Sequence, residues 1–343
     1  MPEDPIDNIN FDELARQAIS APLVNHIYTA DPSAHVFEGK IYIYPSHDIE
    51  AGIPFDDLGS HFAMEDYHVL SMEKPGAHVE DHGVALHVKD VLWADKQMWA
   101  PDAAHKDGKY YLFFPAKKAD GIFQIGVAIG DKPSGPFHPE PNPIEGTYSI
   151  DPAVFEDEDG SYYLYFGGIW GGQLQSYREN KYNIAHREPA EYAPALGPRM
   201  AKLSDDLLKL GEPVREILIV DEQGEPLRAG DNERRFFEAP WVHKYNGVYY
   251  FSYSTGDTHY ICYATGDNPY GPFTYRGRIL EPVVGWTSHH SICLFEGQWY
   301  LFYHDSSLSK GVTHLRSVKM TPLTHREDGS IALINPYNGM KLM

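Results

Sequence analysis

The chain has 343 residues, and its 49 Asp and Glu against 28 Lys and Arg give a formal net charge of −21 at pH 7. A field of this sign repels polyanions, so nucleic acids and anionic membrane surfaces are excluded as partners bound through their phosphates. The composition combines 24 Tyr and 16 Phe with 30 Gly and 26 Pro. Such a mixture favours short strands joined by tight turns, and it predicts an all-β protein.

The N-terminal residues predict one short helix. Over residues 10–19, Asn10 can cap the helix, Glu13 follows three positions later, and apolar residues fall on one face. The sequence Met1–Pro5 is acidic, unlike the start of a signal peptide, and no apolar run approaches the roughly 18 residues of a membrane span. We therefore expect a cytoplasmic protein with an extension over residues 1–22 and a single domain over residues 23–343.

One sequence pattern then recurs five times along the chain. Each copy has a polar or aromatic opening, a few small or apolar residues, a turn with Gly and a strand rich in Tyr and Phe, which together predict a hairpin. The copies cover residues 31–44, 99–114, 151–166, 238–253 and 289–303, with turn glycines at positions 39, 108, 160, 247 and 297. The glycines are thus 69, 52, 87 and 50 residues apart, which leaves room for about four strands per unit. The pattern predicts a five-bladed β-propeller that folds as one domain.

Other segments add detail to this prediction. Residues 125–137 are echoed by residues 261–273, as expected for a third strand in two of the units. Residues 173–232 match no repeat and hold loops and a short amphipathic piece over residues 203–210, which the sequence does not place. The two cysteines, Cys262 and Cys293, lie in apolar strand-like runs, and we expect buried free thiols.

The starts of the five copies carry the candidate site. In a propeller the first strand of each blade lines the central channel, so residues at the same offset before each turn glycine converge on the axis. Eight or nine residues before the glycines stand Asp31, Trp99 or Ala100, Asp151, Glu238 and His289. Three carboxylates with an aromatic and an imidazole predict a site that cleaves a neutral sugar.

A simpler interpretation is that the Asp-Pro pairs only cap turns, and for a single pair this interpretation is favoured. Three acids in register across different blades favour catalysis instead. Glu238 lies between Phe237 and Ala239-Pro240-Trp241, an apolar setting that raises the pKa of a carboxyl group. An acid that stays protonated near neutrality can protonate a leaving-group oxygen.

Three short segments carry a family resemblance. Ala30-Asp31-Pro32-Ser33, Ser149-Ile150-Asp151-Pro152 and Phe237-Glu238-Ala239-Pro240, in this order on a five-bladed pattern, resemble glycoside hydrolase family 43. The likeness extends from residue 27 to residue 318. It implies that Asp31 is the general base, that Asp151 tunes and positions the acid, that Glu238 is the general acid, and that hydrolysis inverts the configuration. Base and acid in non-adjacent blades leave room for a water, as inversion requires.

The resemblance also implies residues that bind substrate. His289 matches an axial histidine often found beside a hydrated calcium, and Arg316 resembles a sugar-binding arginine on the last blade. We expect no required cofactor, with calcium at His289 left open because a lone His is more often a hydrogen-bonded core residue. Trp99 is a candidate for stacking on a sugar. Weaker candidates are Trp286 and Phe62 for stacking and Thr255 and Thr258 for hydrogen bonds near Glu238.

The resulting hypothesis is an exo-acting, inverting glycosidase that releases terminal β-D-xylose or α-L-arabinofuranose from plant cell-wall oligosaccharides. Residues 26–48 resemble the branch that holds both activities, and the loop over residues 49–66 is long enough to wall a pocket. The partner is a neutral oligosaccharide, and the sequence does not set the oligomeric state. One alternative is a non-catalytic carbohydrate- or protein-binding propeller. A second is the retaining, fructan-cleaving propeller group, against which Ile150 before Asp151 and Ala239 after Glu238 argue.

Overall fold

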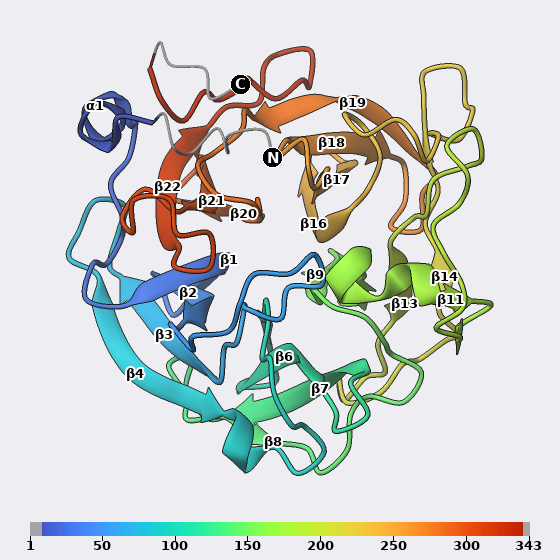
Figure 1. Ribbon diagram of the computed structural model, residues 1–343, viewed down its shortest axis with the longest axis horizontal. Coiled ribbons are helices and arrows are strands. Elements are labelled where there is room, and N and C mark those ends of the chain that lie inside the picture. Colours follow the sequence, from blue (N-terminus) through green and yellow to red (C-terminus); the bar gives the residue numbers. More distant parts are fainter. Residues whose placement is uncertain (1–8, 339–343) are drawn as a thin grey trace.

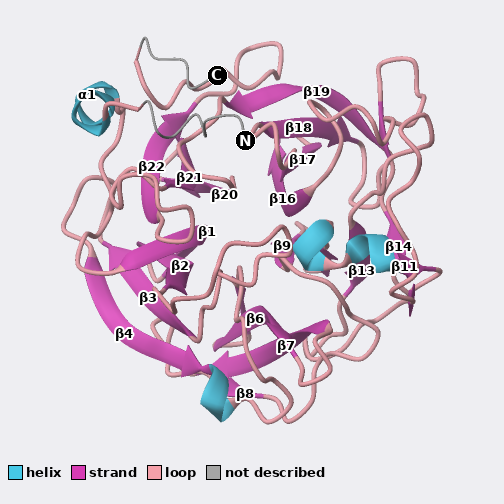
Figure 2. Ribbon diagram, viewed as in Figure 1, coloured by secondary structure: helices cyan, strands magenta, loops and turns pink. Residues whose placement is uncertain are grey.

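The computed structural model describes residues 9–338, and five of its sheets surround a central axis (Figure 1). Loops and strands make up nearly all of the chain (Figure 2). The prediction of an all-β, five-bladed propeller is confirmed. The strands of the blades, from the inside outwards, are β1 (Tyr28–Phe37), β2 (Lys40–Asp48), β3 (Asp66–Met72) and β4 (Glu80–His87) in blade 1; β5 (Asp102–Lys106), β6 (Lys109–Lys117), β7 (Phe123–Gly130) and β8 (His138–Pro139) in blade 2; β9 (Ala153–Glu156), β10 (Tyr162–Phe166), β13 (Arg199–Lys202) and β14 (Arg215–Glu216) in blade 3; β16 (Glu238–Tyr245), β17 (Val248–Ser254), β18 (Ile261–Gly266) and β19 (Phe273–Leu280) in blade 4; and β20 (His290–Phe295), β21 (Gln298–Asp305) and β22 (Ser317–Leu323) in blade 5.

The apolar core lies between neighbouring sheets. All five residues of β10 are buried, and the aromatic second strands of the other blades are largely buried too. Cys262 and Cys293 are buried free thiols, as predicted. Because each sheet buries its faces against the next one, the ring is stabilised as a whole.

Blade 5 closes the ring of sheets. It has three strands, and the segment before β1 runs beside its outer strand β22, where the Leu23 amide donates to the Val318 carbonyl at 2.8 Å. The Thr29 amide donates to the Arg316 carbonyl at 2.9 Å. The first strand of the ring is thereby fixed to the last one.

The helix α1 (Phe11–Gln17) lies within the range predicted from the sequence. The Asn10 side chain accepts a hydrogen bond from the Glu13 amide at 3.1 Å, and Leu14 is buried against Val284 and Tyr337. Residues 1–8 of the predicted extension lie outside the described residues. None of the described helices is long and apolar enough to cross a membrane.

Residues 173–232, which the sequence could not place, contribute to three parts of the fold. The 3-10 helix η3 (Trp170–Gly172) lies directly before this segment. The segment itself begins with the 3-10 helix η4 (Leu174–Ser176) and a small hairpin of β11 (Tyr177–Arg178) and β12 (Lys181–Tyr182). It then supplies β13 and β14 of blade 3. Finally β15 (Ile219–Val220) pairs in parallel with β19 of blade 4, so one insertion joins both blades.

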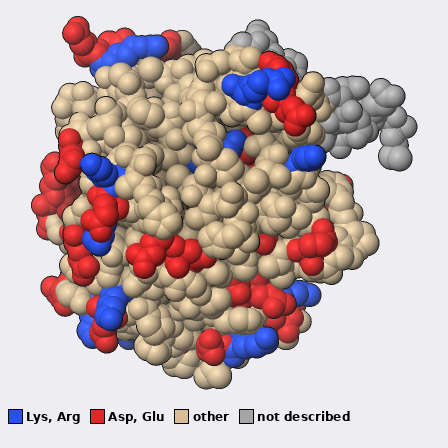
Figure 3. Space-filling view, turned by 90° about the vertical axis from the view of Figure 1, so that its left-hand side faces the viewer, with Lys and Arg blue, Asp and Glu red and all other residues tan. Residues whose placement is uncertain are grey.

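The surface reflects the charge of the chain. On the side of the molecule that carries α1 and β4, Asp and Glu form several clusters with fewer Lys and Arg between them (Figure 3). A third short 3-10 helix, η2 (Val88–Asp90), follows β4 at the periphery of the ring (Figure 1).

Candidate active site

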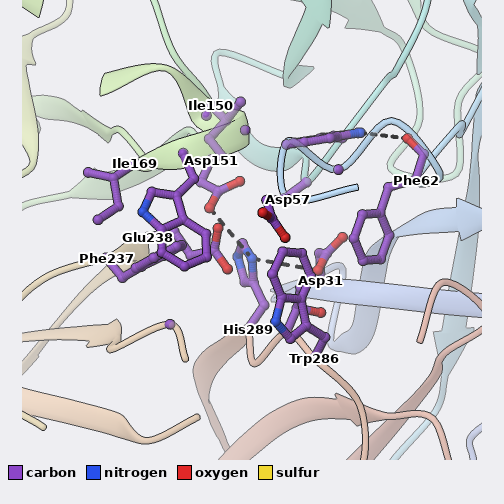
Figure 4. Close-up of a pocket in the computed structure, with 18 of the residues that line it drawn as sticks. Asp31, Asp57, Phe62, Ile150, Asp151, Ile169, Phe237, Glu238, Trp286 and His289 are labelled. Carbon is purple, nitrogen blue, oxygen red and sulfur yellow. Dashed lines mark hydrogen bonds and ion pairs between the residues drawn. The ribbon is translucent and has the colours of Figure 1, made fainter. Parts of the chain in front are cut away.

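A pocket opens where the first strands of blades 1, 3 and 4 begin (Figure 4). About 670 Å³ of space not filled by atoms lies within it, open solvent at the mouth included. The structure brings eight of the predicted residues into its lining: Asp31, Phe62, Trp99, Asp151, Glu238, Trp286, His289 and Arg316.

The same backbone irregularity positions the acids in blades 1 and 4. In β1 the pairing with β2 shifts between Ala30 and Ser33, and in β16 the pairing with β17 shifts between Glu238 and Trp241. Each shift inserts one extra residue, which makes a β-bulge. Bulges redirect side chains and are common beside active sites.

The residue inside each bulge has a left-handed backbone. Asp31 has φ 49°, Ala239 has φ 59°, and Asp151 at the start of blade 3 has φ 56°. A proline follows each of them. Asp31 and Asp151 are therefore equivalent, whereas Glu238 lies one residue before the equivalent position. The prediction that all three acids share one register is wrong by one residue for Glu238, although its side chain still lines the same pocket.

Asp31 is held ionised by its neighbours. Arg316 donates from Nη1 to Asp31 Oδ1 at 2.9 Å, and the Ser46 hydroxyl donates to Oδ2 at 2.7 Å. Burial alone would raise the pKa of Asp31, but the Arg316 charge opposes it and the pKa falls to about 2. Arg316 is fixed in turn by Asp48, which accepts from its Nε at 2.8 Å and its Nη2 at 2.7 Å. Asp31 thus carries a negative charge at neutral pH.

Glu238 has the opposite character. Burial raises its pKa, the Asp31 charge raises it further, and the value reaches about 8. Asp151 also has a pKa well above the usual range because of burial and the nearby Glu238 carboxyl, while the Ala239 amide donates to its Oδ2 at 2.9 Å. Glu238 is therefore protonated at neutral pH, as its apolar sequence setting predicts.

His289 lies between two of the carboxylates (Figure 4). Its Nδ1 is 3.7 Å from Asp31 Oδ1 and 3.9 Å from Asp151 Oδ2. Burial lowers the pKa of His289 to about 4, so the imidazole is neutral at pH 7. Behind Asp31, the His304 Nδ1 accepts a hydrogen bond from the Asp31 amide at 2.9 Å.

Sequence reasoning missed several of these supporting residues. Asp48 ends β2, Ser46 lies in β2, and His304 lies in β21, so all three are on second strands. Counting back from the turn glycines examines first strands alone. The register of the hairpin, with Ala30 opposite Ser46, is the signal that would have pointed to β2.

Aromatic residues and two loops form the walls. The Trp99 Nε1 donates to the Phe62 carbonyl at 2.8 Å, which fixes the indole beside the pocket. The pocket-wall loop, residues 49–65 between β2 and β3, meets the helix η3 where Leu58 approaches Gly171 so closely that a Cβ on Gly171 would lie 2.6 Å from the Leu58 oxygen. Trp286 completes the wall through Phe55, with ring centroids 5.1 Å apart. The predicted wall over residues 49–66 is thus present in the structure.

Two predicted residues are not in the pocket. The hydroxyls of Thr255 and Thr258 lie 2.7 Å apart and bond within their own region, Thr255 with Tyr260 and Thr258 with the Asn232 carbonyl. Neither residue lines the pocket; their neighbours Gly256 and Asp257 do. The prediction that these threonines donate near Glu238 is wrong because Thr255 bonds within its own turn to Tyr260 and Thr258 bonds to Asn232 of another segment.

The donor set around His289 fits a hydrated cation better than a tightly held calcium. The neutral imidazole offers a lone pair, but the carboxylates that face it already accept hydrogen bonds from Arg316, Ser46 and Ala239. Calcium takes six to eight oxygen ligands. Most of its ligands here would be waters, with His289 as the protein ligand and Asp31 and Asp151 as acceptors for those waters.

The comparisons with known proteins agree on one family. Residues 21–331 match the model of glycosyl hydrolases family 43. The chain is 62% identical to xylosidase/arabinosidase 43A of Humicola insolens, over 92% of this chain and 99% of the relative.

Two solved structures are close in fold and sequence. A GH43_1 enzyme from Xanthomonas citri complexed with xylose has a TM-score of 0.92 and 67% identity, covering 96% of this chain and 97% of its own. A GH43 β-xylosidase/α-arabinofuranosidase from a compost microbial metagenome, in complex with xylotriose in a calcium-free form, has a TM-score of 0.92 and 66% identity, covering 94% and 99%.

Proposed function

The chain belongs to glycosyl hydrolase family 43 and is a glycosidase, and we propose that it releases terminal β-D-xylose or α-L-arabinofuranose from neutral plant cell-wall oligosaccharides with inversion of configuration. One observation carries the mechanism. A single pocket holds a carboxylate with a pKa of about 2, Asp31, and a carboxylic acid with a pKa of about 8, Glu238. Two carboxyl groups whose pKa values are pushed apart are the acid and the base of such a reaction.

Each group has a defined step. Asp31 removes a proton from a water, which attacks the anomeric carbon from the face opposite the leaving group. Glu238 gives its proton to the glycosidic oxygen as the bond to that carbon breaks. The reaction leaves Asp31 protonated and Glu238 ionised, and exchange with solvent restores both. Asp151 is a positioning residue: it accepts a hydrogen bond on its Oδ2 from the amide of Ala239, the residue directly after Glu238, and so helps to orient the acid.

Chain-end specificity follows from the walls. The pocket-wall loop and η3 meet at Leu58 and Gly171, so one side of the pocket is closed to further sugar units. Arg316 is buried, and its guanidinium lies 4.8 Å from the Phe62 ring centroid, which places a polar group and a flat apolar face in one subsite. The relatives named as xylosidases and the neighbours complexed with xylose and xylotriose support a pentose in that subsite.

We propose that hydrolysis needs no tightly bound metal. A hydrated cation on His289 would supply positive charge beside Asp31 and Asp151 and would favour their ionised forms. The hydrolytic step itself is assigned to the side chains of the pocket.

The test is the stereochemistry of the first product. Proton NMR during hydrolysis of an aryl β-D-xyloside should show α-xylose before mutarotation, and the Asp31 and Glu238 carboxyl oxygens should lie about 6.5 to 9.5 Å apart in a crystal structure. Appearance of β-xylose first, or a trapped glycosyl-enzyme on Asp31 or Asp151, contradicts inversion. Absence of turnover on both xylosides and arabinofuranosides would favour the non-catalytic binding propeller.

A further inference from the structure

A second cluster of imidazole and carboxyl side chains lies outside the pocket, on blade 1. Among the described residues, His47, Asp66 and His68 form a group whose ligand atoms all lie within 4.8 Å of one another. Their side chains keep 12 to 18% of their surface exposed, so the group is reachable from solvent. None of the three lines the pocket.

The sheet brings these residues to one face. In the pairing of β2 with β3, Ile41 lies opposite Met72 and Ile43 opposite Leu70, and continuing this register places His47 opposite Asp66. Asp66 and His68 are two residues apart in β3, so their side chains share a face. The His47 and His68 ring centroids are 4.6 Å apart, and the His47 Nδ1 is 2.6 Å from Asp66 Oδ1.

Asp81 of β4 prepares His68 as a ligand. The His68 Nδ1 lies 2.8 Å from Asp81 Oδ1, which can accept its proton and leave a lone pair on Nε2. Histidines that bind metals commonly place their second nitrogen against a carboxylate in this way, which fixes the ring and its tautomer. Asp81 is itself held by the Gly83 amide at 2.8 Å and by His26 at 2.7 Å.

We propose that His47, Asp66 and His68 bind a zinc-class transition-metal ion at the base of the pocket-wall loop. Two imidazoles and one carboxylate with an open fourth position are the donors that Zn²⁺ takes, whereas Ca²⁺ prefers oxygen. A tetrahedral site with metal–ligand bonds of about 2.0 to 2.1 Å needs its ligand atoms about 3.4 Å apart. The ligand atoms already lie within 4.8 Å of one another, so small rotations of the side chains bring them to this separation. The ion takes the place of the proton between His47 Nδ1 and Asp66 Oδ1.

The proposed metal site is connected to the sugar pocket through the pocket-wall loop. His47 stands beside the last residue of β2 and Asp66 begins β3, so they flank the two ends of the pocket-wall loop. The residue after His47 is Asp48, which holds Arg316 and through it Asp31. A bound ion would join both ends of the loop that walls the sugar subsite.

The experiment is a titration of the metal-free enzyme with ZnCl₂ at pH 7.5, followed by calorimetry and by thermal unfolding. We expect one zinc ion per chain and a rise in Tm of about 3 to 5 °C at a hundredfold excess of zinc over its Kd. His47→Gln and His68→Gln should each weaken zinc binding by at least about tenfold. The variant His82→Gln, on β4 with a similarly shielded imidazole bonded to Ser71, should bind zinc as the wild type does.

The channel histidine provides a second control. His289→Ala should retain the zinc event, which separates this site from any cation held in the pocket. Failure of the wild type to bind zinc, or undiminished binding in both folded variants His47→Gln and His68→Gln, overturns the proposal. Equal weakening in His82→Gln also overturns it, because zinc would then be held by scattered surface imidazoles. Since binding and Tm are measured without substrate, none of these outcomes depends on the function proposed for the pocket.

Discussion

In blade 1 the bulge of β1 places Asp31 in the left-handed region between Ala30 and Pro32, whereas in blade 4 the same bulge of β16 places Ala239 there and leaves Glu238 one residue earlier. The partner strands are also equivalent. Ser46 stands opposite Ala30, and Ser254 stands opposite Glu238. The two blades therefore offer nearly the same backbone to two carboxyl groups.

The contacts of the two groups differ. Ser46 donates to Asp31, but the Ser254 hydroxyl is engaged by Ser288 at 2.8 Å. Arg316 donates directly to Asp31, whereas its effect on Glu238 is weaker than that of burial and of the Asp31 charge. A shift of one residue along the same bulge is thus enough to separate a base from an acid, because it decides which hydrogen-bond donors the carboxyl reaches.

The largest expected effect is on kcat, when the acid, the base or the positioning carboxyl group is removed. Asp31→Asn and Glu238→Gln should each lower kcat by about 10² to 10⁴, the usual contribution of a general base or acid. Asp151→Asn should lower kcat by at least about 10², because the acid then loses the residue that positions it. Circular dichroism should confirm that each variant is folded. Activity within tenfold of wild type in Asp31→Asn or Glu238→Gln would remove that residue from its role.

The second expected effect is on stability, with opposite signs in the two blades. The native pKa of Glu238 is raised above its unfolded value of 4.5 to about 8, so its ionisation destabilises the fold as pH rises from 4.5 towards 8. At pH 7 this amounts to at most about 3 kcal/mol, and Glu238→Gln should raise Tm by a few degrees there and by nothing near pH 4.5.

The native pKa of Asp31 is instead lowered from 3.8 to about 2, so its stabilisation is fully present above pH 3.8 and is lost as pH falls through 2. Asp31→Asn should therefore lower Tm at pH 7, by an amount that corresponds to about 2 kcal/mol. Shifts of the same sign in both variants would show that the pKa values are not separated in the folded protein.

Much of this arrangement was predictable. The five x-Gly turns fix where each first strand ends, so the propeller and the convergence of Asp31, Asp151 and Glu238 follow from spacing. The one-residue displacement of Glu238 did not follow, because a bulge breaks the regular alternation on which such counting depends. Thr255 and Thr258 were misplaced for another reason: the sequence does not show that their hydroxyls bond to each other and to the Tyr260 and Asn232 carbonyls.

The third expected effect distinguishes acid from base through the leaving group. A nitrophenolate departs with little protonation, whereas the xylose of xylobiose needs the proton of Glu238. Glu238→Gln should lose at least about tenfold more kcat on xylobiose than on a nitrophenyl xyloside. Asp31→Asn should lose about the same factor on both substrates. Equal losses for Glu238→Gln would reassign the acid.

The fourth expected effect concerns His289, which lies between the Asp31 and Asp151 carboxylates. A cation held by one imidazole and waters should have a Kd of about 10⁻⁴ to 10⁻³ M. Addition of 10 mM calcium should raise the Tm of the wild type by about 1 to 3 °C and that of His289→Ala not at all. A chelator that removes trace calcium should leave kcat nearly unchanged. A large loss of activity on chelation, restored by micromolar calcium, would show a tightly held ion instead.

The smallest expected effect is a shift in the pKa of Glu238, produced without altering either reacting carboxyl group. Asp257 is an exposed residue of the pocket, and its charge contributes to the raised pKa of Glu238, after burial and Asp31. The alkaline limb of kcat/KM reports the acid of the free enzyme and should lie near pH 8. Asp257→Asn removes a nearby negative charge, so this limb should move down by about 0.3 to 0.5 of a pH unit.

The matched control for this variant is Asp267→Asn, an equally exposed acid of the same blade that lies outside the pocket, and its limb should not move. High salt should shrink the difference between Asp257→Asn and wild type, because the interaction passes partly through solvent. An unchanged or upward-shifted limb in Asp257→Asn would mean that burial and Asp31 alone set the pKa of Glu238. A shift of equal size in Asp267→Asn would mean that the net charge of the chain, rather than the pocket of blade 4, keeps the acid protonated.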